Sequence, residues 1–207
     1  MCDSYVTVEK EAISEFVEKR SKFIGYIRPA LTENDALSFI SEIKSKHWDA
    51  RHNVYAYAIR ENNISRYSDD GEPHGTAGLP ILDIIKKNNL KNVAVVVTRY
   101  FGGILLGTGG LVRAYSQAAS SAINLARVVE MVRCYDCSLL CDYNQYGKVA
   151  NIISECGGVV NKTNFSNEVE VDFYVQQSVL PKLSKKILEV SSGTLRCDVL
   201  GENFYSL

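Results

Sequence analysis

An apolar run at residues 93–97 is the feature that most constrains the fold of this 207-residue chain. Its five residues, Val-Ala-Val-Val-Val, include four β-branched side chains and show no polar alternation. A short continuous run of this kind is typical of a strand that is covered on both faces. The sequence therefore predicts a fully buried strand over 93–100, and the chain leaves it through a glycine-rich segment.

Strand and helix signals surround this run. Strands are predicted over 13–30, 54–59 and 64–67, with a turn between the last two. Thr32 and Asp35 are spaced as a capping box, which predicts a helix from there to about Lys46. A short helix is predicted over 79–87, and a long one begins after Gly107. The apolar side of the long helix is predicted to contain Leu111, Tyr115, Ala118, Ala122 and Leu125.

The second half of the chain shows a βαββαβ order, which resembles a ferredoxin-like unit. Strands are predicted over 130–141, 159–163, 169–175 and 194–200. Helices are predicted after the candidate N-cap Asp142 and over 178–190. We place a domain boundary near 130–135 and expect two domains, 1–130 and 131–207.

The composition argues against a membrane-spanning protein and against a secreted one. No apolar run approaches the roughly 18 residues that span a bilayer, and residues 1–20 hold four glutamates and no apolar signal core. Six cysteines in this pattern do not resemble a secreted disulfide framework. Cys134 and Cys137 would point to opposite faces of a strand, which favours structural thiols over a metal site. We expect a cytoplasmic protein with reduced thiols and no membrane partner.

The formal net charge is −1, from 23 basic and 24 acidic residues. This balance lacks the bulk positive charge of a dedicated nucleic-acid binder, so a contact with phosphate would depend on a local patch. We expect no sequence-specific binding to DNA.

The glycine-rich segment has the composition of an anion site. Glycines here let the backbone approach a ligand, and the amides at a helix start favour phosphate or carboxylate. We predict Thr108 as the N-cap, with Arg99 and Arg113 beside it. The spacing fits neither a P-loop nor a dinucleotide fingerprint. The alternatives are that the glycines serve a tight turn and close helix–sheet packing, or that they form a catalytic nucleotide site. The glycines are Gly102, Gly103, Gly107, Gly109 and Gly110.

A second polar cluster contains Asp69, Asp70, Glu72 and His74. Three carboxylates and an imidazole within six residues could hold a divalent ion or act as a general acid–base set. Acidic loops with glycine and proline are more often solvated turns, so a loop that is salt-bridged to Arg51 or Arg99 is the structural alternative. We assign no metal ligand and no catalytic residue.

Three separated motifs together resemble the signature of the IMPACT/YigZ family. They are Asp49-Ala50-Arg51-His52, then Ser68-Asp69-Asp70-Gly71-Glu72-Pro73 with Gly75-Thr76-Ala77-Gly78, then Arg99-Tyr100-Phe101-Gly102-Gly103 with Arg113-Ala114-Tyr115. The resemblance covers roughly residues 10–126. The tail from about 135 is similar to the small C-terminal domain of the bacterial, YigZ-type members.

The resemblance implies an α+β protein with a ribosomal protein S5 domain 2-like domain followed by a ferredoxin-like domain. Both are similar to domains of elongation factor G. It also implies a theme of translation, because eukaryotic relatives restrain the general-control kinase by binding its activator. Some bacterial members have been labelled as proline dipeptidases, but no paired-metal ligand set is evident in this chain.

We therefore expect a non-catalytic cytoplasmic regulator, without a cofactor, that binds RNA, the ribosome or a translation-linked protein through an anion-binding helix start. The residues assigned to that site are Arg51, His52, Arg99, Gly102, Gly103, Gly107, Thr108, Gly109, Gly110 and Arg113. The alternative is a metal- or nucleotide-dependent hydrolase or phosphotransferase that uses the loop of Asp69, Asp70 and Glu72. Small-molecule kinases of the same fold superfamily support it by analogy only. A third possibility is a module for protein interaction alone.

Overall fold

The computed structural model describes residues 4–207, which divide into two compact units: Tyr5–Glu130, and Ser4 with Met131–Leu207. Each unit mixes helices with an antiparallel sheet, which confirms the predicted α+β class and the two-domain arrangement. Within the described residues, no helix is both long and apolar enough to cross a membrane.

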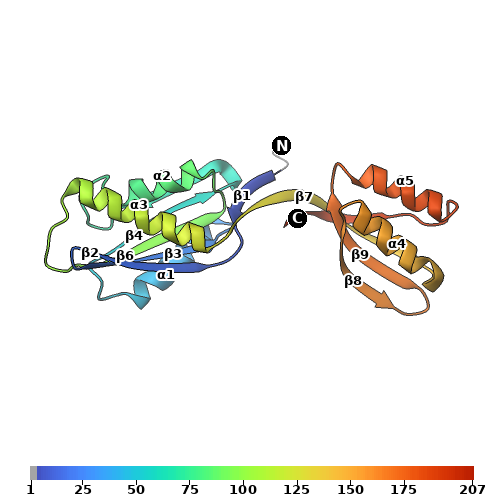
Figure 1. Cartoon of the computed structure of the whole chain (residues 1–207), viewed down its shortest axis with the longest axis horizontal. Coiled ribbons are helices and arrows are strands. Elements are labelled where there is room, and N and C mark those ends of the chain that lie inside the picture. The colour runs from blue at the N-terminus through green and yellow to red at the C-terminus, as the bar shows by residue number, and fades with distance from the viewer. Residues whose placement is uncertain (1–3) are drawn as a thin grey trace. The chain divides into compact units, whose positions relative to one another are not determined.

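The sheet of the first unit has the order β2-β3-β6-β4-β5 and is antiparallel throughout (Figure 1). Strand β6 lies at its centre, between β3 and β4. The strands are β2 (Ala12–Glu18), β3 (Ser21–Pro29), β4 (His52–Ile59), β5 (Ile64–Ser68) and β6 (Val93–Tyr100), and β1 (Ser4–Val8) precedes them.

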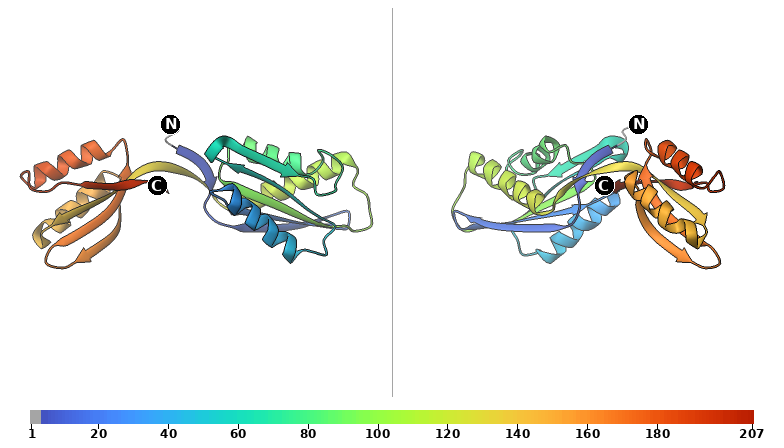
Figure 2. Two further views of the ribbon diagram at one scale, coloured as in Figure 1. Left: turned by 180° about the vertical axis from the view of Figure 1, so that it is seen from behind. Right: turned by 45° about the vertical axis from the view of Figure 1, so that its right-hand side comes forward.

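Helices cover both faces of this sheet, as the apolar run of β6 requires. Helices α2 (Gly78–Lys87) and α3 (Thr108–Leu125) pack on one face with Val95 and Val97, while α1 (Glu33–Lys46) packs on the other with Val96. Figure 2 shows α1 lying against the sheet in the view from behind. All five residues of the run are fully buried, which confirms the prediction.

Local signals set the helix boundaries as predicted in most places. The Thr32 hydroxyl accepts from the Asp35 amide at 3.1 Å, and the Asp35 carboxylate accepts from the Thr32 amide at 2.8 Å, so the capping box is confirmed. The prediction that Leu125 faces the core is wrong, since Leu125 is 57% exposed. With 3.6 residues per turn, the buried stripe drifts to Ile123 and Ala126 at the end of α3.

The second unit has the element order β7 (Val128–Cys141), α4 (Tyr143–Glu155), β8 (Val159–Phe165), β9 (Val169–Gln176), α5 (Leu180–Val190) and β10 (Asp198–Ser206). The strands lie side by side as β10-β7-β9-β8, and both helices contribute to one core. This is the βαββαβ order predicted from the sequence. The last strand was predicted over 194–200 but runs over Asp198–Ser206. Residues 191–193 form a turn, 194–197 are irregular, and Ser191 Oγ accepts from the Leu195 amide at 3.1 Å.

Candidate functional site

A cavity of about 480 Å³ in the first unit brings together residues from all three of the separated motifs described above. The sequence left open whether the acidic loop and the glycine-rich segment meet. Both line this cavity, as does the end of β6. The lining residues are Arg51, His52, Glu72, Pro73, Arg99, Phe101, Leu105, Leu106, Gly107, Thr108 and Leu111. A second hollow of about 550 Å³, bordered by residues such as Arg66 and Lys91, contains none of the predicted site residues.

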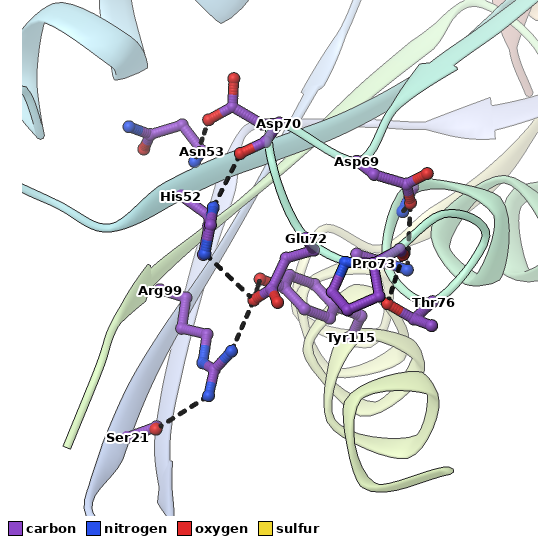
Figure 3. A network of polar contacts seen from close by, with 12 residues as sticks. Ser21, His52, Asn53, Asp69, Asp70, Glu72, Pro73, Thr76, Arg99 and Tyr115 are labelled. Atoms are coloured by element: carbon purple, nitrogen blue, oxygen red, sulfur yellow. Dashed lines mark hydrogen bonds and ion pairs between the residues drawn. The ribbon is translucent and has the colours of Figure 1, made fainter. Parts of the chain in front are cut away.

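A buried ion pair forms the floor of the polar network (Figure 3). The Arg99 guanidinium donates to Glu72 Oε1 at 2.6 Å and to Ser21 Oγ at 3.3 Å. The Tyr115 hydroxyl donates to the same Glu72 oxygen at 2.8 Å, and burial together with the Glu72 charge raises the pKa of that phenol. The predicted salt bridge between the loop and Arg99 is therefore confirmed, and such charge-assisted contacts fix the carboxylate.

His52 faces this pair from β4. Its Nδ1 lies 2.7 Å from the Asp70 carbonyl oxygen, which can only accept, so Nδ1 carries the proton. Its Nε2 then lies 3.8 Å from Glu72 Oε1 (Figure 3). Asp70, with a left-handed φ of 45°, holds its carboxylate between Lys44 Nζ and the Asn53 amide, each at 2.7 Å. Asp70 is therefore a positioning residue for His52 and does not line the cavity.

Asp69, in the same loop, binds backbone amides before and at the start of α2. One Asp69 oxygen accepts from the Gly78 amide at 2.8 Å, and the other accepts from the Gly75 amide at 2.9 Å. His74 is exposed, with its Nδ1 at 3.7 Å from Asp69. Among residues 4–207, no group of three or more His, Cys, Asp or Glu side chains is arranged to hold a metal ion. Only Glu72 of the predicted loop set reaches the cavity.

The start of α3 differs from the prediction. Gly107 is the N-cap, with φ 73° and ψ 167°, and Thr108 is the first helical residue, so the prediction of Thr108 as N-cap is wrong. This backbone region is accessible almost only to glycine, which is why a hydroxyl residue does not occupy the cap. The first helical bond runs from the Leu111 amide to the Gly107 carbonyl at 3.0 Å. The amides of 108–110 have no acceptor among the described residues, as at any uncapped helix start.

Some of the remaining glycines allow close packing, and one adopts the positive φ of a turn. A Cβ on Gly102 would lie 2.0 Å from the carbonyl of Arg20, so close backbone packing explains this glycine. A Cβ on Gly110 would lie 3.0 Å from the Leu106 side chain, and Gly109 has only Arg113 nearby. Gly103 adopts φ 83° in the turn after β6. The packing alternative therefore accounts for Gly102, whereas Gly107 lines the cavity.

The three arginines assigned to the anion site do not all lie at this cavity. Arg51 is exposed and lines the cavity, and it forms no ion pair with a described residue. Arg113 instead lines a smaller hollow of about 140 Å³ on another side of the α3 start, with Glu18 and Lys19. Arg99 is committed to Glu72.

An apolar wall was missed by the sequence reasoning. Phe101 and Leu105 line the cavity although they are 47% and 81% exposed, and Leu106 and Leu111 complete the wall. The signal was present in the sequence as a cluster of large apolar residues inside a glycine-rich loop. Exposed apolar residues around a few polar groups are typical of ligand sites.

Comparisons with known proteins agree with this two-domain arrangement. The Impact N-terminal domain model matches residues 19–123, and a domain of unknown function (DUF1949) matches residues 139–194. A solved structure titled "Crystal structure of an hypothetical protein" is 27% identical with a TM-score of 0.63, covering 97% of this chain and 99% of that one.

Curated relatives extend the match over nearly the whole chain. IMPACT family member YvyE of Bacillus subtilis is 41% identical over 93% of this chain and 89% of its own length. IMPACT family member YigZ of Escherichia coli is 30% identical over 86% of this chain and 89% of its own length. Protein IMPACT of Homo sapiens is 35% identical over 44% of this chain and 29% of its own length. Since these matches include both domains in the bacterial relatives, the chain belongs to the IMPACT family.

Proposed function

We propose that this chain is a non-catalytic cytoplasmic protein that binds RNA in association with translation, through the cavity of its first domain. The observation that carries the proposal is the convergence of the uncapped α3 start and the exposed Arg51 guanidinium on one cavity. A helix N-terminus carries about half an elementary positive charge and presents amides to an anion. A phosphate of an RNA backbone suits this arrangement.

The local charge supports the proposal although the chain as a whole has a net charge of −1. Arg99 and Glu72 neutralise each other in their buried pair. Arg51 and the positive N-terminal start of α3 remain, so the cavity retains positive potential without a large basic surface. This fits a contact with a few phosphates better than non-specific coating of nucleic acid.

The apolar wall supports a nucleotide in place of a bare anion. Single-stranded RNA presents unstacked bases that lie on aromatic and apolar side chains. The half-exposed ring of Phe101 and the exposed side chain of Leu105 offer such a surface beside the helix start.

The enzyme alternative has less support from the geometry. Asp69 is bound to backbone amides at the start of α2, and Asp70 is paired with Lys44. A metal-dependent hydrolase or phosphotransferase needs several of these oxygens free and directed at one point. Of these three carboxylates only Glu72 lines the cavity, and it is already paired with Arg99.

The test is the salt-dependent binding of a short single-stranded oligoribonucleotide, measured by fluorescence anisotropy. Arg51→Gln is expected to weaken binding and to reduce the slope of log K against log salt by about 0.7, the share of one phosphate contact. Arg127→Gln is the matched control, because this exposed arginine pairs with Glu9 and does not line the cavity. Absence of oligoribonucleotide binding at low salt would contradict the proposal.

Association with translation is tested separately by sedimentation of cell extract through a sucrose gradient. We expect the chain to co-migrate with ribosomal particles at low salt and Arg51→Gln to remain nearer the top. Equal migration of the natural chain and Arg51→Gln would show that the cavity does not contribute to ribosome association.

A further inference from the structure

The two carboxylate oxygens of Glu72 have different surroundings. Oε1 accepts from Arg99 at 2.6 Å and from Tyr115 at 2.8 Å, and it is also the oxygen nearest His52 Nε2. Oε2 accepts no hydrogen bond from any described residue, although the Glu72 side chain is only 4% exposed and lines the cavity. One oxygen of a nearly buried carboxylate is therefore left for a ligand.

An ionised carboxylate oxygen can only accept, so the complementary ligand group must carry N–H or O–H. Oε2 is not fully buried, so it reaches the solvent in the cavity, where a donor on a ligand can replace water. Arg99 and Tyr115 hold Oε1 from two directions, so Oε2 is oriented before the ligand arrives. The site is preorganised for a hydrogen-bond donor.

The rest of the cavity defines the other parts of the ligand. The amides at the start of α3 and Arg51 favour an anionic group, and Phe101 with Leu105 favours a flat apolar body. A cavity of about 480 Å³ lies within the usual range for small-molecule sites. A nucleotide combines a phosphate, a flat ring and ring-edge N–H donors.

The donor pattern distinguishes the bases. Guanine presents two adjacent donors, N1–H and the 2-amino group, on its Watson–Crick edge. Adenine and cytosine place a ring-nitrogen acceptor next to their amino group, and uracil flanks its N3–H with two carbonyls. An acceptor-only oxygen is repelled by those neighbouring acceptors and is favoured by the guanine edge.

We propose that the cavity recognises a guanine nucleotide, with the N1–H and 2-amino edge on Glu72 Oε2 and the phosphate at the start of α3. This inference rests on the proposed RNA-binding function for the source of the nucleotide. The guanine itself is specified by Glu72, whereas the phosphate is bound by Arg51 and by the start of α3, where Gly107 and Thr108 line the cavity.

The experiment compares oligoribonucleotides that differ at one central base in an otherwise uniform uridine context. We expect guanine to bind roughly tenfold more tightly than adenine, cytosine or uracil, and N1-methylguanine to lose that advantage. Inosine, which retains N1–H but lacks the 2-amino group, is expected to fall between them. These comparisons use only the natural chain, so they hold even where a variant fails to fold.

Two variants then assign the preference. Glu72→Gln replaces the acceptor pair by a mixed amide and is expected to abolish the preference for guanine. Arg127→Gln, which changes an exposed arginine outside the cavity, is the control and is expected to retain the preference. Thermal unfolding of both variants establishes that they fold.

Each outcome separates the two proposals. Equal binding of all oligomers overturns the guanine inference and leaves the RNA-binding function standing. Binding of free guanosine monophosphate, sensitive to Glu72→Gln, with no binding of any oligomer supports the guanine site and overturns the RNA-binding function. Absence of binding in both arms overturns both.

Discussion

The Glu72 carboxylate and the Arg99 guanidinium lie 2.6 Å apart, and neither side chain is more than 6% exposed. Glu72 belongs to the loop after β5, and Arg99 lies near the end of the central strand β6. Their pairing ties the loop to the sheet and shapes one wall of the cavity. Removing one member of a buried pair leaves an uncompensated charge, which is far more costly than losing an exposed pair.

Arg99→Leu is therefore expected to lower the free energy of unfolding by about 3–5 kcal/mol. Urea unfolding followed by circular dichroism measures the change. Lys22→Ala, which breaks the exposed pair with Glu15, is the control and is expected to cost about 1 kcal/mol or less. Similar losses in the two variants would contradict the structural role of the Glu72–Arg99 pair.

Gly107→Ala is expected to destabilise the chain by about 1–3 kcal/mol, because its backbone conformation is accessible almost only to glycine. A Cβ at Gly107 meets no atom within 4 Å, so the cost comes from the backbone and not from a clash. The variant is also expected to weaken RNA binding by disturbing the start of α3.

Gly147→Ala is the matched control, since Gly147 lies inside α4 with open space around its Cβ position. Alanine is a better helix former there, so this variant is expected to gain up to about 1 kcal/mol. Thermal unfolding of the two variants compares them directly. An equal effect of both substitutions would show that the conformation of Gly107 is not strained for alanine.

His47 predicts a pH dependence of stability. Tyr100 donates to Asp49, so His47 Nδ1 donates to Tyr100 Oη at 2.9 Å and Nε2 accepts from Tyr26 Oη at 2.6 Å. Burial, followed by the charge of Lys46, lowers the pKa of His47 below its ordinary value of 6.5. The unfolded chain therefore binds more protons, and stability falls as the pH drops below about 6.5.

Urea unfolding at several pH values between neutrality and pH 5 measures this loss. His47→Gln is expected to remove this contribution, whereas His74→Gln, at an exposed position, is expected to leave it intact. A pH profile that His47→Gln leaves unchanged would contradict the assignment.

The cysteines of β7 are predicted to be unreactive in the folded protein. Burial raises the pKa of Cys137 to about 12 and also raises the pKa of Cys134 and Cys141. The thiolate is the nucleophile that reacts with a thiol reagent, so we expect the half-buried Cys156 to be modified much earlier. Mass spectrometry after timed labelling, with and without denaturant, checks the order. Modification of Cys137 at the rate of Cys156 would contradict it.

Local sequence signals predicted much of this protein. The Thr32–Asp35 capping box, the buried strand β6 and the βαββαβ order of the second domain all depend on residues close together in the chain. Propensity, caps and apolar periodicity act over a few residues, so they are readable without tertiary information. The motifs that resemble the IMPACT family are also short and local.

Only the tertiary structure decided which of the singled-out residues form a site. His52 and Arg99 became neighbours because β4 and β6 pair in that register, and Glu72 reached them through the loop after β5. Arg113 lines a different hollow. Gly107, and not the predicted Thr108, is the N-cap of α3. These outcomes depend on strand register and backbone conformation, which bring together residues tens of positions apart and are not encoded in any short window.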